Sequence, residues 1–221
     1  MKRWNAFTRL SAEVSLQGAI WDFKRVPGLL IDKAFDIRTH DEYLQITPFA
    51  GPDRRSVFVP GRLTIETLEG EVLERRDDPE APFENQVFTD PWDPLQAAFF
   101  ASEALWTYFR SPFLYTYPGF LTKEIEPWQE NGETWRRLEV TFPDNIISHT
   151  KTQVTHFGPD GLMRRHDYTV DILGGTPAPT IRVITASAKV SRCRRSAASM
   201  PMTMQCRRCP SPCLSSSISG D

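Results

Sequence analysis

The chain has 221 residues, among them 14 Phe, 6 Trp and 5 Tyr, and its formal net charge at pH 7 is -2. Residues 1–171 carry 19 basic and 27 acidic side chains, a balance that argues against nucleic acid or an anionic membrane as a partner. No apolar run approaches the roughly 20 residues that span a bilayer, so no transmembrane segment is expected. The basic start is followed by no apolar segment typical of a signal peptide, and we therefore expect a cytoplasmic protein.

The composition changes before the C-terminus. The last aromatic residue is Tyr168, all four cysteines lie within residues 193–213, and residues 172–221 carry 7 basic side chains against 1 acidic one. About 170 residues suffice for one domain with a sizeable core. We therefore predict a single domain over residues 10–178, followed by a different kind of segment over residues 179–221.

The first half of the domain alternates apolar and polar residues over short stretches. Residues 34–39 and 62–67 show this alternation, and Glu69-Gly70 turns the second stretch back into residues 72–75. A period of two over such lengths indicates half-buried antiparallel strands. The stretch 77–82 is polar and contains prolines, which predicts a surface loop.

One segment changes to a helical period. Apolar residues recur at helical spacing from Leu95 to Phe109, after Asp93 as N-cap and Pro94 at the first helical position. Ser111-Pro112 ends the run. An apolar stripe of this kind is typical of a helix that packs on a sheet. The sequence therefore predicts an α+β fold, a curved and mostly antiparallel sheet with one main helix packed on it.

The second half of the domain predicts a meander of two hairpins. Asn131-Gly132 is a strong hairpin signal, and residues 146–157 and 162–172 flank the turn Gly158-Pro159-Asp160-Gly161. A left-handed Gly161 pairs Gly158 with Leu162, which continues into three further pairs. These are Val154 with His166, Thr152 with Tyr168, and His156 with Arg164. On this register the even-numbered side chains face the core and the odd-numbered ones, such as Gln153, Thr155 and Asp167, face solvent.

The last 40 residues fit no structural period and leave three interpretations open. Cys206 and Cys209, with Cys193 and Cys213, would supply four thiolates for zinc, although the spacing lacks a second C-x-x-C pair. A disordered Ser/Arg-rich extension is the second interpretation. The third is a shift of reading frame near Ala178, because codons can be chosen so that the neighbouring frame restores aromatic residues and a strand-like period.

Two stretches carry a resemblance to a known family. The stretch 157–175, with its Asp160-Gly161-Leu162 turn, and Gly18-Ala19-Ile20-Trp21 near the start are similar to a group of bacterial proteins. The order of the predicted elements resembles the outer-membrane lipoprotein carriers and their relatives, the LolA-like fold. The resemblance implies a curved sheet, closed by a helix, that encloses an apolar cavity for acyl chains.

Two hypotheses for function follow. The first is non-enzymatic binding of an apolar or lipid-like small molecule between the sheet and the helix, without a cofactor or metal. Its expected lining is Trp21, Phe35, Trp106, Phe109, Leu138, His156, Arg164, His166 and Tyr168. The alternative is a small cofactor-free enzyme in which His156 or His166 acts as general base. His40 and His149 are isolated in sequence and predict surface positions, and nothing in the sequence indicates an oligomeric state.

Overall fold

The computed structural model describes residues 2–177, 181–184, 203–206 and 215–217. Its strands are β1 (Arg9–Leu16), β2 (Lys33–Arg38), β3 (Leu44–Thr47), β4 (Arg54–Val59), β5 (Arg62–Thr67), β6 (Val72–Asp77), β7 (Leu121–Glu130), β8 (Glu133–Thr141), β9 (Thr152–Phe157), β10 (Met163–Asp167), β11 (Thr169–Val170), β12 (Thr176–Pro177), β13 (Ile181–Ile184), β14 (Thr203–Cys206) and β15 (Ser215–Ser217). Its helices are α1 (Lys2–Asn5), α2 (Ala19–Phe23) and α3 (Pro94–Arg110), with the 3₁₀ turns η1 (Ala81–Phe83), η2 (Phe113–Thr116) and η3 (Asp171–Leu173).

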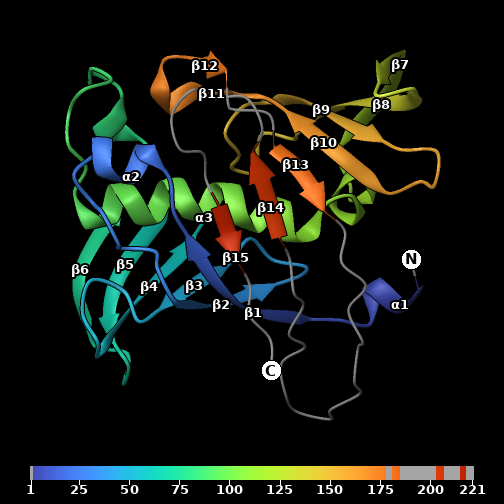
Figure 1. Ribbon diagram of the computed structural model, residues 1–221. Helices are drawn as coiled ribbons and strands as arrows, with labels where there is room; N and C mark the ends of the chain where they lie inside the picture. The colour runs from blue at the N-terminus through green and yellow to red at the C-terminus, as the bar shows by residue number, and fades with distance from the viewer. Residues whose placement is uncertain (1, 178–180, 185–202, 207–214, 218–221) are drawn as a thin grey trace.

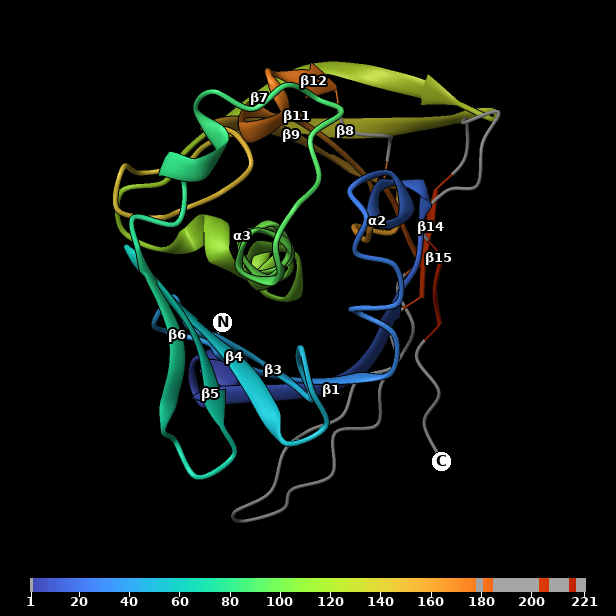
Figure 2. The same cartoon turned by 90° about the vertical axis from the view of Figure 1, so that its left-hand side faces the viewer.

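The described strands form one long antiparallel sheet and a small separate pair. The long sheet has 13 strands in the order β6-β5-β4-β3-β2-β1-β15-β14-β13-β10-β9-β8-β7, and β11 pairs with β12. Viewed along α3, the sheet curls around the helix, with β1–β6 on one side and β7–β9 on the other (Figures 1 and 2). The predicted fold class, a curved antiparallel sheet with one main helix, is confirmed.

The segment after residue 178 is described only in part. Its three described pieces, β13, β14 and β15, pair between β10 and β1 in the long sheet. Most of the predicted tail, 179–221, and the side chains of its four cysteines lie outside the described residues. The zinc site, the disordered extension and the shift of reading frame therefore stay predictions.

The main helix begins and ends where the sequence predicts. The Asp93 side chain accepts a hydrogen bond from the Gln96 backbone at 2.8 Å, and the Gln96 side chain accepts one from the Asp93 backbone at 3.1 Å. This reciprocal cap, with Pro94 at the first helical position, satisfies backbone donors that the first turn leaves free. The helix ends at Ser111, which takes an extended conformation before Pro112.

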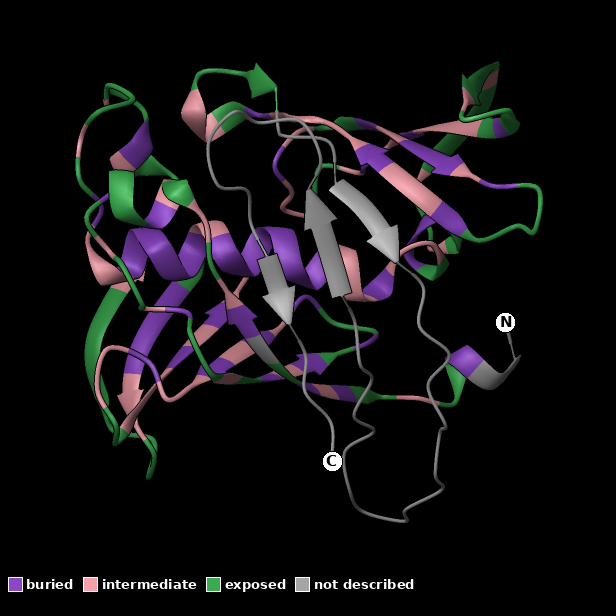
Figure 3. Ribbon diagram, viewed as in Figure 1, coloured by how far each residue is buried: buried purple, intermediate pink, exposed green. Residues whose placement is uncertain are grey.

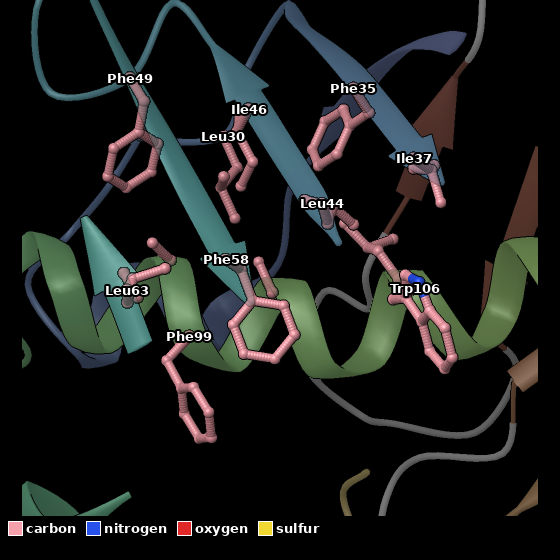
Figure 4. Packing of buried hydrophobic residues seen from close by; sticks show 14 of the residues in the cluster. Leu30, Phe35, Ile37, Leu44, Ile46, Phe49, Phe58, Leu63, Phe99 and Trp106 are labelled. Atoms are coloured by element: carbon pink, nitrogen blue, oxygen red, sulfur yellow. The ribbon is translucent and has the colours of Figure 1, made fainter. Parts of the chain in front are cut away.

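The core lies between α3 and the strands β2–β5. Phe99 of α3 meets Phe58 of β4 edge to face, with ring centroids 5.9 Å apart, and Leu44 and Leu63 are buried on the same side (Figure 4). Figure 3 shows that α3 is buried along most of its length. The apolar stripe predicted from the sequence is therefore only one part of the helix surface that the fold covers.

Both predicted hairpins are present, but one register changes along its length. Gly161 is left-handed (φ 76°), the Gly158 backbone donates to the Leu162 carbonyl at 2.9 Å, and Phe157 faces Met163 as predicted. A bulge between Met163 and Arg165 then shifts the pairing by one residue.

The shift makes the three pairs predicted further along this hairpin wrong. His156 faces Arg165 instead of Arg164, His166 faces Thr155 instead of Val154, and β10 ends at Asp167 before Tyr168 can pair with Thr152. The turn fixes only the first pair of this hairpin, and the alternation of apolar and polar residues does not show that one strand carries an extra residue further along.

Replacing Phe58 by alanine removes a fully buried ring and its edge contact with Phe99. We expect the free energy of unfolding to fall by about 3–5 kcal/mol. Chemical denaturation followed by circular dichroism measures this change. Val87→Ala is the control, because Val87 is 61% exposed and its loss should change stability by less than about 0.5 kcal/mol. Equal effects of the two variants would contradict the described core.

Candidate functional site

A pocket of about 440 Å³ lies between the β7–β8 hairpin and the turn that joins β9 to β10. Leu138 and Phe157 supply its apolar surface, together with Pro159 of the turn. Arg136 and Glu124 line it as well. This volume falls within the usual range for small-molecule sites, about 300–1,000 Å³.

The strand register places most of this lining on the inner face of the sheet, the face toward α3. Leu138 is directly opposite Thr155, whose hydroxyl lies 2.8 Å from the Tyr115 hydroxyl in the core. Arg136 is opposite Phe157 on the same face. The pocket therefore opens on the concave side of β7–β9, beside η2.

The polar wall of the pocket is an ion pair. The Arg136 guanidinium donates to both carboxylate oxygens of Glu124, at 2.7 and 2.8 Å. These hydrogen bonds lower the pKa of Glu124, so the carboxylate stays charged near neutral pH. The pair is exposed to solvent and contributes little to stability by itself. The pocket therefore combines an apolar floor with a charged edge that this ion pair supplies.

Four of the predicted lining residues belong to the packed interior. Trp21 and Phe35 are almost fully buried, and Trp106 donates from its indole nitrogen to the Asp41 carbonyl at 3.0 Å. Phe109 is half-buried and packs against the same core. Leu138 is the predicted lining residue that the structure places in the pocket. Ligand contact by the other four stays a prediction.

His156 lies on the outer face of the sheet, away from α3. It is opposite Arg165, and its neighbour in sequence, Thr155, points inward. The His156 side chain is fully buried because the rings of Trp128 and Trp135 lie edge-on against it, at 6.1 and 6.5 Å between centroids. The expectation that it faces the core with the other even-numbered residues is therefore wrong.

The partner of His156 is a carboxylate on the next strand. The Nε2 atom of His156 lies 3.0 Å from Asp167, and Arg165 donates to the same carboxylate at 2.7 Å. Burial alone would raise the pKa of Asp167, but these two hydrogen bonds outweigh it and bring the pKa down to about 2. The outer face is thus covered by indole rings and an ionic network, which is why burial alternates poorly along β9.

His166 and Tyr168 lie on the inner side, the side expected for even-numbered residues, in a cluster with Glu103, Tyr108 and His149 that the sequence pattern does not indicate. Glu103 of α3 lies 2.6 Å from Nδ1 of His149, and the His149 ring stacks on Tyr168 with centroids 5.4 Å apart. Tyr108 of α3 contacts the Tyr168 hydroxyl and meets the His166 ring edge-on at 5.9 Å. Burial lowers the pKa of His166 to about 4, so this imidazole is neutral at pH 7.

The two histidines proposed as catalytic bases therefore lie on opposite faces of the sheet and cannot act in one cavity. Arg164 joins neither of them, because its guanidinium donates to Asp160 at 2.6 Å at the hairpin turn. His149, expected at the surface, is buried against Glu103, whereas His40 is exposed as predicted. The only sequence signal for the Glu103–His149 pair is an acidic residue inside an apolar helix.

A second buried carboxyl joins the two wings of the sheet. Glu42, in the turn between β2 and β3, accepts hydrogen bonds from the Ile147 backbone at 3.2 Å to each oxygen. Burial raises the pKa of Glu42 to about 8; the Ile147 N–H and Arg110 oppose this, and Glu103 reinforces it. The carboxyl is therefore mostly protonated at pH 7. A glutamate in a β-turn gives no sign of burial in the sequence.

Comparison with known proteins shows similarity in structure only. No protein-family model matches the chain, and no curated protein matches it in sequence. The chain is similar to a LolA superfamily protein from Nitrosomonas europaea, with 8% identity over 96% of this chain and 83% of that chain and a TM-score of 0.46. It is also similar to a DUF1329 family protein from Desulfovibrio piger, with 13% identity over 99% and 86% of the chains and a TM-score of 0.47.

A third similar structure is a domain assigned to outer membrane lipoprotein sorting in Vibrio parahaemolyticus. It is 11% identical over 86% of this chain and 70% of that chain, with a TM-score of 0.35. The arrangement that the sequence resemblance implies, a curved antiparallel sheet around one main helix, is the one that the strands and helices show. The three structural similarities say nothing of the role of this chain.

The expected cytoplasmic location is corrected by these comparisons. Two of the similar structures are a LolA superfamily protein and a domain assigned to outer membrane lipoprotein sorting, and neither supports that expectation. The expectation was based on the missing apolar segment after the basic start, which says nothing about the fold. Among the described residues, no helix is long and apolar enough to cross a membrane.

The buried Glu42 predicts a loss of stability at alkaline pH. The unfolded chain ionises this group near pH 4.5 and the folded chain only near pH 8, so the folded state alone holds the proton between these values. Stability should therefore fall by about 1.4 kcal/mol for each pH unit in that window. Glu42→Gln should remove most of this slope, and urea denaturation from pH 5 to 8.5 measures it.

Glu71→Gln is the control for this experiment, because Glu71 is exposed. It should leave the slope unchanged. If Glu42→Gln has the slope of the unaltered protein, Glu42 is ionised in the folded state and the account of its burial is wrong.

Proposed function

We propose that this protein binds a lipid-like amphiphile without chemical change, with the apolar part of the ligand in the pocket on the inner face of β7–β9. The observation that carries the proposal is the pocket itself, about 440 Å³ with Leu138 and Phe157 as its floor. Apolar surface buried against these side chains supplies the binding energy, at about 25 cal/mol for each Å².

The polar wall supports an amphiphilic ligand over a purely apolar one. Arg136 and Arg137 both line the pocket, and Arg136 is already paired with Glu124. Arg136 lies on the inner face beside Leu138, whereas Arg137 is opposite His156 and turns its side chain to the outer face. The Arg136–Glu124 pair is exposed, so the Arg136 guanidinium can also contact a polar group of a ligand. The ligand is therefore expected to place its chain on Leu138 and its head near Arg136.

The position of the pocket supports reversible binding. The pocket lies at the surface, between two hairpins whose turns contain left-handed glycines, Gly132 and Gly161. A site of this kind can admit a ligand without unfolding the core between α3 and β2–β5, where Phe35 and Phe58 are closely packed. The core supports the fold and the pocket takes the ligand.

Leu138→Glu tests the proposal. The substitution places a charge on the pocket floor, and binding of a fluorescent fatty acid should weaken at least about tenfold, since roughly 1.4 kcal/mol of apolar contact is lost. Titration followed by fluorescence measures the affinity. Leu121→Glu is the matched control, because Leu121 lies on the adjacent strand β7, is 68% exposed and does not line the pocket.

The control variant should bind as the unaltered protein does. Circular dichroism of both variants checks that the sheet is intact. Equal affinity of Leu138→Glu and the unaltered protein would overturn the proposal, and so would an equal loss in Leu121→Glu.

A further inference from the structure

The last residue of α3, Arg110, is a buried cation whose donors are poorly satisfied. Its side chain is fully buried, and its Nε, Nη1 and Nη2 atoms make no hydrogen bond of full geometry with any described residue, although the Tyr117 hydroxyl lies close enough to raise the pKa of the guanidinium. A buried charge without a partner is among the most costly features of a folded protein. Its presence at this position points to an anion that the described part of the chain does not supply.

Aromatic rings cover the flat faces of the Arg110 guanidinium. The Arg110 Cζ atom lies 3.7 Å from the ring centroid of Trp106 and 4.7 Å from that of Tyr117. Cation–π contacts of this kind use the faces of the group and leave the N–H bonds, which lie in its plane, free to donate. The contacts hold the guanidinium in one orientation without satisfying its donors.

The walls of this site are themselves fixed by the turn between β2 and β3. The Trp106 indole donates to the Asp41 carbonyl at 3.0 Å, and the Tyr117 hydroxyl donates to the Thr39 carbonyl at 2.9 Å. The Trp4 indole donates in turn to the Tyr117 hydroxyl at 3.2 Å. The two rings against Arg110 are therefore held in place before any anion binds.

The acidic groups near Arg110 are engaged elsewhere. Both carboxyl oxygens of Glu42 accept from the Ile147 backbone, and burial keeps Glu42 mostly protonated at pH 7. The Asp41 side chain is 75% exposed and lies 4.0 Å from Arg38. Burial lowers the pKa of Arg110, and Tyr117, Glu42 and Asp41 oppose this only in part. The guanidinium thus carries a charge that these neighbours do not neutralise.

We propose that Arg110 is the receptor of an anion-binding site at the C-terminal end of α3, which takes a carboxylate or phosphate group through the free edge of its guanidinium. The planar fork of donors matches two oxygens of either group, as bidentate pairs do elsewhere in proteins. The site is separate from the pocket at Leu138 and does not depend on the proposed function of that pocket. The two sources of such an anion are a free ion and the head group of an amphiphile.

Thermal unfolding in phosphate at pH 7 tests the proposal, with sodium chloride used to hold ionic strength constant. A ligand that binds only the folded state raises the Tm in a saturable way. We expect inorganic phosphate to raise the Tm of the unaltered protein and of Glu42→Gln, and to have no effect on Arg110→Gln. Arg75→Gln is the matched control, since it removes an exposed arginine that belongs to neither proposed site, and it should respond as the unaltered protein does.

A second variant and a direct probe keep the test decisive if Arg110→Gln does not fold. Arg110→Lys keeps the charge but loses the fork, and its half-saturating phosphate concentration should be roughly tenfold higher. Side-chain NMR of the unaltered protein should show the Arg110 Nε resonance shift on addition of phosphate. Acetate and decanoate, added in parallel to the Leu138→Glu variant so that the other pocket does not contribute, distinguish the sources. Decanoate acting at far lower concentration than acetate and phosphate identifies a head group, and equal action identifies a free ion.

The proposal is overturned if none of these anions changes the Tm or the Arg110 resonance at matched ionic strength. It is also overturned if Glu42→Gln abolishes the phosphate response while Arg110→Gln retains it. The Leu138→Glu variant should keep the full phosphate response. A loss of fatty acid binding in that variant therefore reports on the pocket alone.

Discussion

The structure depends on burying one helix from several sides. α3 lies inside a curled antiparallel sheet, with Phe99 packed on β4 and with Glu103 and Arg110 buried as well (Figure 2). A helix in this position cannot expose its polar groups to solvent, so contacts with the surrounding chain have to replace water. The cap at Asp93, the carboxyl–imidazole contact of Glu103 and the aromatic rings against Arg110 are consequences of that requirement.

The segment between β8 and β9 supplies one of these partners and a second polar contact that joins the wings of the sheet. His149 contacts Glu103 of the helix, and the Ile147 backbone donates to Glu42 in the β2–β3 turn. The strands of the two wings are far apart in the sheet order, so these polar contacts on the open side complement the pairing of β13–β15 on the other. Closure on the open side thus relies on titratable groups, which couples the fold to pH.

The local elements could be predicted from the sequence because their signals are local. Asp93-Pro94 and Ser111-Pro112 delimit the helix, and Gly161 fixes the first pairs of the β9–β10 hairpin. The faces of β9 could not be predicted, because Trp128 and Trp135 cover its outer side and bury His156 there. The alternation of apolar and polar residues along a strand shows which face is buried only where the other face is exposed to water.

The candidate site was only partly predictable for the same reason. Leu138 follows from its position on a strand, but its pocket is made by a turn from another hairpin. Arg110 and Glu42 are charged residues that sequence reasoning assigns to the surface, and the burial of both depends on contacts over long sequence distances. Buried charge is where local rules fail, and here it also marks the second proposed site.

The most direct measurement of the central claim is hydrogen–deuterium exchange with and without a saturating fatty acid. The account predicts slower exchange in residues 134–138 and 157–161, which line the pocket between the two hairpins, and no change in β4 and β5, whose side chains form the closed core. Slower exchange in β4 and β5, with none at the pocket, would show that the ligand enters between the helix and the sheet and would contradict the account.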